Sequence, residues 1–206
     1  MDQREVQSVL SMCHQHDIDA MVRAPTQERT KLYRYFEDGA SGLLMPLVDD
    51  VQEARAIARS VKFPPIGNRG IDGAGLDADF AIDAENFTTD ANAETFVILQ
   101  IETLNALQQA EQIAGVEGID GIFVGPADLS LRLGLADGAP SLDEAMQLVA
   151  DAAASQGKAW GTAGGGVEEW KKYRQMGAQL LIGAGDFALR DVLEGAKNSM
   201  DEALGD

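Results

Sequence analysis

The segment from Phe96 to Ser130 constrains the fold more than any other part of the chain. It opens with a short apolar run over 96–101, continues through a polar stretch with helical spacing, and reaches a second apolar run over 119–124. Short and nearly continuous apolar runs are typical of parallel strands buried on both faces. A strand, a crossover helix and a second strand are therefore expected, and consecutive strands of this kind usually neighbour each other in a parallel sheet.

The same alternation continues along the whole chain, after a helix that begins with a capping-box pattern at Asp2 and Glu5. The expected strands are 18–23, 42–48, 96–101, 119–124, 158–162 and 179–182, each followed by a helix. Strict alternation favours a parallel sheet, and a (β/α)8 TIM-barrel type is the leading candidate, with six of its eight strands present here and two expected to precede Met1. An open doubly wound sheet is the alternative, but the residues after Arg23 lack its Gly-rich phosphate-binding turn.

Composition limits the classes of partner. With 206 residues, 45% of them hydrophobic, the chain is expected to form one domain over 1–206. A net charge of −18 opposes binding to nucleic acid or to an anionic membrane. The single cysteine, Cys13, excludes an internal disulfide, and the sequence contains neither a signal peptide nor a membrane-spanning run, so a cytoplasmic protein is expected.

Polar side chains follow the two central strands where they end. Gln100 and Glu102 share one face of their strand, because strand side chains alternate. The next strand runs into Gly125 and Pro126, and Pro126 suits the first position of a helix that contains Asp128. In neighbouring parallel strands, Glu102 and Asp128 would emerge at the same carboxyl edge, about one strand spacing of roughly 5 Å apart. Such a pair either binds a cation or competes for a proton, and the alternative is two solvated or ion-paired acids.

Five motifs together resemble the HpcH/HpaI family, the metal-dependent class II pyruvate aldolases that include enzymes cleaving 4-hydroxy-2-oxoheptanedioate and 2-keto-3-deoxyglucarate. The motifs are MVRAP at 21–25, LLMPLV at 43–48, PPIGNRG at 64–70, LQIET at 99–103 and GPADLS at 125–130. The resemblance implies a (β/α)8 barrel, often a hexamer, whose C-terminal helix packs on a neighbouring subunit. Family members begin with a further strand, helix and strand ending in a D-x-E-H-type motif that supplies the presumed base, and this N-terminal βαβ portion is not found in the sequence.

The resemblance also implies roles for individual residues. Glu102 and Asp128 match the metal ligands, and hard oxygen ligands suit Mg²⁺ or Mn²⁺, with Co²⁺ as a further candidate. Gln100 and Arg23 match residues that contact the pyruvate part of the substrate. On the bare sequence, Arg23 could equally pair with a structural carboxylate, and Gln100 could be a hydrogen-bonded core amide.

Two further expectations concern the surroundings of this site. The helix start at Gly125, Pro126 and Ala127 would hold the substrate carboxylate, as helix N-termini hold anions. Asp38 matches an aspartate that assists the base in the family, but it precedes a strand and could reach an active site only across a subunit contact. A catalytic role is therefore expected for Arg23 and, through such a contact, for Asp38.

The function expected from the resemblance is that of a carbon–carbon lyase, which cleaves a 4-hydroxy-2-oxo acid through a pyruvate enolate stabilised by the metal and releases an aldehyde. A homo-oligomer is expected. One alternative is a non-catalytic subunit that binds a metal and a 2-oxo acid without turnover, because the presumed base is missing. A second alternative is a citrate-lyase-like acyl-CoA lyase, which shares the fold and the acidic ligands.

Other residues that could carry chemistry are assigned to the opposite face. His14 and His16 end a helix that leads into a strand, and Lys158 starts a strand, so all three are expected away from the catalytic end of a barrel. A Schiff-base lysine is therefore disfavoured. The Gly-rich stretch 63–79 is long for a connection, and its Arg69 is expected either to bind a substrate anion or, preferably, to order the loop through a salt bridge.

Overall fold

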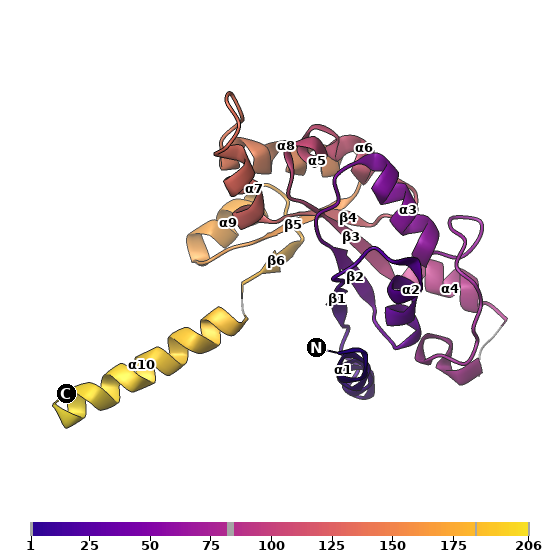
Figure 1. The fold of residues 1–206 in the computed structure, drawn as a ribbon, viewed down its shortest axis with the longest axis horizontal. Coiled ribbons are helices and arrows are strands. Elements are labelled where there is room, and N and C mark those ends of the chain that lie inside the picture. The colour runs from indigo at the N-terminus through magenta and orange to yellow at the C-terminus, as the bar shows by residue number, and fades with distance from the viewer. Residues whose placement is uncertain (1, 82–84, 184, 206) are drawn as a thin grey trace.

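The computed structural model describes residues 2–81, 85–183 and 185–205, and these form one curled sheet of six parallel strands (Figure 1). The spatial order of the strands follows the chain order, from β1 to β6. Their bounds are β1 Met21–Arg23, β2 Gly42–Met45, β3 Phe96–Ile101, β4 Gly121–Val124, β5 Ala159–Ala163 and β6 Leu180–Ile182. The parallel sheet confirms the predicted alternation. Since β1 and β6 each pair with one neighbour among the described residues, the sheet is a half-barrel and not a closed barrel.

Helices follow the strands, and apart from α10 they lie on the outer, convex side of the sheet in Figure 1. Their bounds are α1 Gln3–Gln15, α2 Arg29–Glu37, α3 Val51–Val61, α4 Phe87–Glu94, α5 Leu104–Gln108, α6 Ala110–Ala114, α7 Pro126–Leu133, α8 Leu142–Ser155, α9 Val167–Gln175 and α10 Asp186–Leu204, with a 3-10 turn, η1, at Leu76–Ala81. The predicted strands agree with the structure to within a few residues, and the sequence pattern also predicts a weak helix near 81–91. There the helix starts later, at Phe87, and residues 82–84 of the prediction lie outside the described part.

Local sequence explains where several helices begin. Asp2 accepts hydrogen bonds from the backbone N–H groups of Arg4 and Glu5, and the Glu5 side chain accepts from the Asp2 N–H. Ser141 and Glu144 form the same reciprocal pair at the start of α8. These capping boxes satisfy N–H groups that have no partner within the helix, and the first of them confirms the helix start predicted at Asp2.

The core has two layers because neighbouring residues of a strand face opposite sides of the sheet. Leu43, Leu99 and Ile122 are fully buried between the sheet and the helices, in the larger cluster. Leu44, Ile98 and Phe123 form a smaller cluster on the concave face. Gln100 has the same parity as Ile98 and therefore belongs to the concave side, where a barrel would have its interior.

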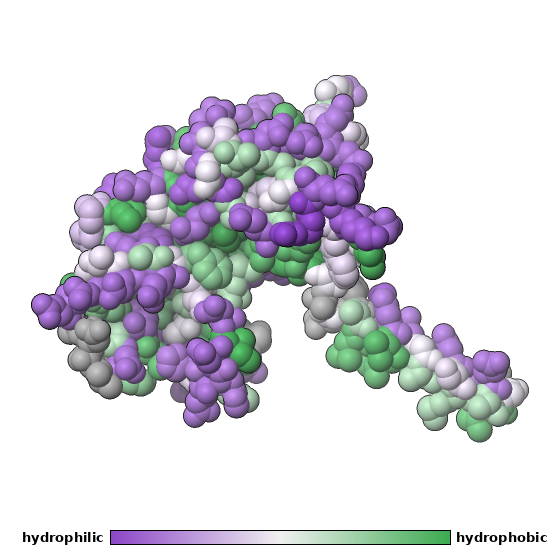
Figure 2. Space-filling view, turned by 180° about the vertical axis from the view of Figure 1, so that it is seen from behind, coloured by the Kyte–Doolittle hydropathy of each residue, from purple (hydrophilic) through white to green (hydrophobic). Residues whose placement is uncertain are grey.

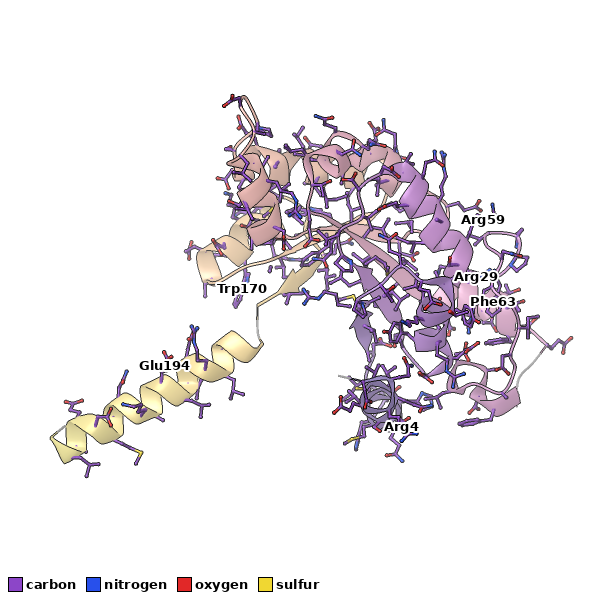
Figure 3. The ribbon with its side chains drawn as sticks, in the orientation of Figure 1. Arg4, Arg29, Arg59, Phe63, Trp170 and Glu194 are labelled. Carbon is purple, nitrogen blue, oxygen red and sulfur yellow. The ribbon has the colours of Figure 1, made fainter. Side chains whose placement is uncertain are left out.

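The Gly-rich stretch 63–79 connects α3 to η1 on the amino side of the sheet and is ordered by a buried ion pair. Arg69 donates to the Asp77 carboxylate, and its guanidinium carbon lies 4.5 Å from the centre of the Phe63 ring, which is labelled in Figure 3. Only 2% of the Arg69 side chain and 7% of the Asp77 side chain are exposed. This confirms the prediction that Arg69 orders the loop.

Trp170 of α9 packs at the β6 side of the sheet, as Figure 3 shows. Its indole lies between the backbone after β5 and the backbone after β6, so closely that a Cβ on Gly183 would lie 2.1 Å from Trp170 Cζ2. Glycine is therefore required at that contact, and Trp170 serves there as a packing residue.

Helix α10 projects away from the rest of the chain, with Glu194 on it well separated from the sheet (Figures 1 and 3). Figure 2 shows apolar surface along this helix. Leu189, Val192, Leu193, Met200 and Leu204 are each at least 60% exposed. Within the described residues, no helix combines the length and the apolar character needed to cross a bilayer.

Candidate active site

The sheet register places Glu102 directly beside Gly125. Ile101 at the end of β3 pairs with Val124 at the end of β4, so the next residues of the two strands, Glu102 and Gly125, lie together at the carboxyl edge. A Cβ built on Gly125 would lie 2.2 Å from Glu102 Oε1. Only glycine leaves room for the Glu102 side chain in this position.

The Glu102 carboxylate is buried, with 5% of the residue exposed, and both of its oxygens accept hydrogen bonds. The backbone N–H of Leu47, just after β2, donates to Oε2 over 2.8 Å. The Gln100 side-chain amide donates to Oε1 over 3.1 Å. These two donors orient the carboxylate from two neighbouring strands.

The side-chain oxygen of Gln100 has no hydrogen-bond partner among the described residues. Gln100 is 4% exposed, and its Oε1 is a buried acceptor without a hydrogen bond among the described residues. An unpaired buried acceptor is energetically costly, so such atoms call for an explanation such as a bound ion, water or ligand. The orphaned oxygen lies on the concave side, next to the carboxylate that the same side chain orients.

Charged groups around Glu102 affect its ionisation. Burial raises the pKa of Glu102, and the hydrogen bond from Leu47 opposes this rise. The nearby Asp128 carboxylate raises the pKa of Glu102 further, whereas Arg132 and Arg23 lower it. Asp128, Arg132 and Arg23 therefore act on Glu102 through their charges.

Asp128 lies in the first turn of α7, where a negative charge interacts favourably with the helix dipole. Its side chain is 54% exposed, and Arg132, one turn later, donates to Oδ1 over 3.0 Å. The first backbone bond of the helix runs from the Leu129 N–H to the Gly125 carbonyl. The N–H groups of Ala127 and Asp128 precede that bond, and Pro126 has none, so two donors remain at the helix start.

Arg23 ends β1 as an exposed residue, on the same carboxyl edge. Asp38, by contrast, follows α2 and precedes β2, on the amino side of the sheet. It is 3% exposed, and Gln3, Gln7 and Arg34 all bond or pair with its oxygens. The structure therefore brings Arg23, Gln100, Glu102 and the start of α7 together, and it leaves Asp38 apart from them.

The residues assigned to the opposite face are found there. His14 and His16 end α1 ahead of β1. Lys158 precedes β5, and its Nζ donates to the backbone carbonyl of Ile119 over 2.6 Å. Neither an imidazole nor a lysine amine stands beside Glu102 within the described residues.

Comparison with known proteins identifies the family. A family model described as HpcH/HpaI aldolase/citrate lyase matches residues 3–188. The chain belongs to this family. A crystal structure of an HpcH/HpaI aldolase from Desulfitobacterium hafniense DCB-2 has a TM-score of 0.90 to this chain at 28% identity, covering 98% of this chain and 80% of the other.

Among curated HpcH/HpaI relatives, 4-hydroxy-2-oxovalerate aldolase of Rhodococcus jostii (strain RHA1) is 38% identical over 136 residues, which are 66% of this chain and 52% of that protein. Hydroxypyruvate/pyruvate aldolase of Deinococcus radiodurans is 31% identical over 186 residues, 87% of this chain and 66% of that protein. The chain spans about half the length of the first of these relatives.

The donor set of this HpcH/HpaI chain fits a hard divalent cation. Glu102 with the unpaired amide oxygen of Gln100 lies at the end of β3, and Asp128 lies in the first turn of the helix that follows β4; oxygen ligands of this kind are those that Mg²⁺ and Mn²⁺ prefer. No group of three or more His, Cys, Asp or Glu side chains suited to a metal occurs in the described part of the chain. A cation held by Glu102 and Asp128 would therefore keep several positions for water or substrate oxygens.

Sequence reasoning missed two contributors to the HpcH/HpaI site. Leu47 acts through its backbone N–H, which carries no signature in residue type. Arg132 lies four residues after Asp128, a spacing that places two residues on one helix face and could have predicted the ion pair.

Proposed function

We propose that the chain is a divalent-metal-dependent carbon–carbon lyase that acts on 4-hydroxy-2-oxo acids and yields pyruvate and an aldehyde. The observation that carries the proposal is the buried Glu102 carboxylate, held by Leu47 and Gln100 beside an unpaired amide oxygen. The names of the family relatives, which are aldolases of oxovalerate and pyruvate compounds, support the reaction class.

Glu102 and Asp128 are the residues that would hold Mg²⁺, Mn²⁺ or Co²⁺. Because Arg132 bonds to Oδ1 of Asp128, the other oxygen of that carboxylate is the one available to a cation. A bound divalent cation supplies Lewis-acid stabilisation of the negative charge that builds up on the substrate's keto oxygen. Gln100 would accept a hydrogen bond through its unpaired Oε1, from water or from the substrate.

The other residues of the edge bind and orient the substrate. Arg23 would place a positive charge near the substrate's keto oxygen and lower the energy of the negative charge that builds up there. The N–H groups at the start of α7, in the stretch Gly125, Pro126 and Ala127, would bind the carboxylate of the 2-oxo acid, because a helix N-terminus attracts anions.

Cleavage breaks the bond between C3 and C4 while a base takes the proton of the 4-hydroxyl group, so that C4 leaves as the aldehyde. The electron pair of the broken bond passes to the pyruvate enolate, which takes up a proton at C3 to give pyruvate. Asp38 would assist such a base only in an assembly of several chains, because it lies on the amino side of its own sheet with both oxygens already bonded.

A homo-oligomer is part of the proposal, since the apolar residues of α10 are uncovered in the single chain. Exchange of α10 between copies, in a dimer or a hexamer, would cover them, and light scattering after size exclusion measures this.

The test of the metal site is the binding of Mn²⁺, followed by electron paramagnetic resonance, with and without pyruvate. The expected result is binding that pyruvate strengthens and that Glu102→Ala abolishes. Glu117→Gln is the control and should bind as the parent does. Glu117 is exposed and lies between α6 and β4, on the amino side of the sheet and away from Glu102. Equal binding in parent and Glu102→Ala would refute the assigned site.

A second candidate is a subunit that binds the metal and a 2-oxo acid without turnover. It is favoured by the position of both histidines on the amino side of the sheet, away from Glu102. Release of pyruvate from a 4-hydroxy-2-oxo acid, measured with lactate dehydrogenase, separates the two: release supports the lyase, and metal binding without release supports the binding subunit. Binding of coenzyme A would instead indicate an acyl-CoA lyase.

A further inference from the structure

The backbone of Leu47 is in a conformation that leucine rarely adopts. Its φ of 54° lies in the left-handed region, where a side chain crowds its own backbone. Strain of this kind persists only where the surrounding structure holds it, and it is concentrated at functional sites. A glycine or an asparagine would adopt this turn at lower cost, so the turn alone does not explain a leucine here.

Contacts of the residues after Leu47 hold its backbone in place. Pro46 precedes it and has no N–H, so the Leu47 amide is the first donor available after the end of β2. Val48 is fully buried, and Asp49 accepts a hydrogen bond from the Thr103 hydroxyl over 2.6 Å. Asn105 donates to the Asp49 carbonyl over 3.1 Å. These contacts fasten the loop after β2 to the loop after β3.

With the backbone fastened in this way, the Leu47 N–H points at Glu102 Oε2 over 2.8 Å. The Leu47 side chain is 49% exposed, although Leu43, Leu44, Met45 and Val48 around it are buried. Packing of the side chain therefore does not account for the conformation. The left-handed φ turns the chain after Leu47 into the fastened loop, while the Leu47 N–H, which lies in the peptide plane shared with Pro46, donates to the buried carboxylate.

We propose that Leu47 is the positioning residue for Glu102: the left-handed turn at Leu47 lets the chain enter the loop fastened to the one after β3 while its N–H fixes the carboxylate for cation binding. The cation part rests on the proposed function, whereas the fixing of the carboxylate does not. Partners that orient a metal ligand typically change metal affinity by about 10–100-fold when they are lost. Because the role depends on the backbone conformation, residues that adopt the left-handed conformation easily should be tolerated at position 47 better than residues that resist it.

The first arm of the test compares Leu47→Val with Leu47→Gly. Valine is β-branched and resists the left-handed conformation, whereas glycine adopts it freely. The expected result is that Leu47→Val binds Mn²⁺ at least about tenfold more weakly than Leu47→Gly. Leu148→Val is the matched control, because Leu148 is 50% exposed and lies on α8 away from the site, and it should bind as the parent does. Equal affinities for the valine and glycine variants would overturn the inference.

The second arm needs no metal and separates this inference from the proposed function. Hydrogen exchange of the Leu47 amide, followed by NMR in metal-free protein, should be at least about tenfold slower in the parent than in Glu102→Ala, because the hydrogen bond protects it. Equal exchange in both proteins would overturn the inference. If no variant bound Mn²⁺ yet the Leu47 amide remained protected by Glu102, the proposed metal chemistry would fail and the positioning role would stand.

Discussion

Replacing Gly125 by alanine tests the close approach on which the geometry of the site depends. Gly125 has a φ of −86°, which alanine adopts without strain, so the substitution adds a methyl group and little else. The three atoms nearest to that methyl carbon all belong to Glu102: Oε1 at 2.2 Å, Cγ at 2.7 Å and Cδ at 2.8 Å. We therefore expect the main effect of Gly125→Ala to pass through Glu102.

The size of the effect follows from these distances. Carbon and oxygen atoms in ordinary contact lie roughly 3.5 Å apart, so the Glu102 carboxylate must move by about 1 Å or more. A displacement of that size disrupts the bonds from Leu47 and Gln100, which are 2.8 and 3.1 Å long. Overpacking of a tight site costs about 1–3 kcal/mol, and we expect a loss of unfolding free energy in that range. Cation affinity should fall at least about tenfold.

Urea denaturation measures the loss of unfolding free energy in four proteins: the parent, Gly125→Ala, Glu102→Ala and the double variant. Without the Glu102 side chain the three closest contacts of the added methyl group are gone, so Gly125→Ala should cost much less in that background. The double-mutant cycle should give a coupling of about 1–3 kcal/mol. Gly134→Ala is the control, since its nearest contact would be an ordinary 3.5 Å. The reasoning is refuted if Gly125→Ala destabilises the protein equally with and without Glu102.

Three further predictions concern the stability of the fold. Leu99→Ala should cost about 2–5 kcal/mol in urea denaturation, because Leu99 is fully buried, whereas Leu131→Ala at a 64% exposed position should change little. Arg69→Gln removes the guanidinium group and leaves the Asp77 carboxylate buried and unpaired, so it should lower the free energy of unfolding by about 3–5 kcal/mol. The double variant Arg69→Gln/Asp77→Asn should lose less, and an equal loss in the two variants would contradict this. Burial raises the pKa of Glu37 above its usual 4.5, so the folded state holds that proton more tightly and loses stability as the pH rises through this range. Glu37→Gln should accordingly stabilise the protein more at pH 7 than at pH 4, and an equal gain at both would show that the carboxyl is not perturbed.

The order of strands and helices could be predicted from local pattern alone. Apolar runs such as 96–101 and the capping residues at Asp2 and Glu5 report on neighbours within a few positions along the chain. Parallel pairing followed from the alternation of the two element types. The placement of Gln100 and Glu102 on one side of a strand followed from the two-residue period, and the bond between them agrees with it.

Contacts between distant segments could not be predicted in this way. The bond from Leu47 to Glu102 joins residues 55 positions apart, and it depends on a backbone angle that residue type does not announce. The unpaired oxygen of Gln100, the exclusion of any side chain at Gly125 and the bonds of Asp38 to α1 likewise depend on what packs against them. Sequence thus determined which groups come to the carboxyl edge, because strand period and element order are local. Tertiary structure decided how those groups are held, because orientation is set by hydrogen bonds and close contacts between chain segments that only folding brings together.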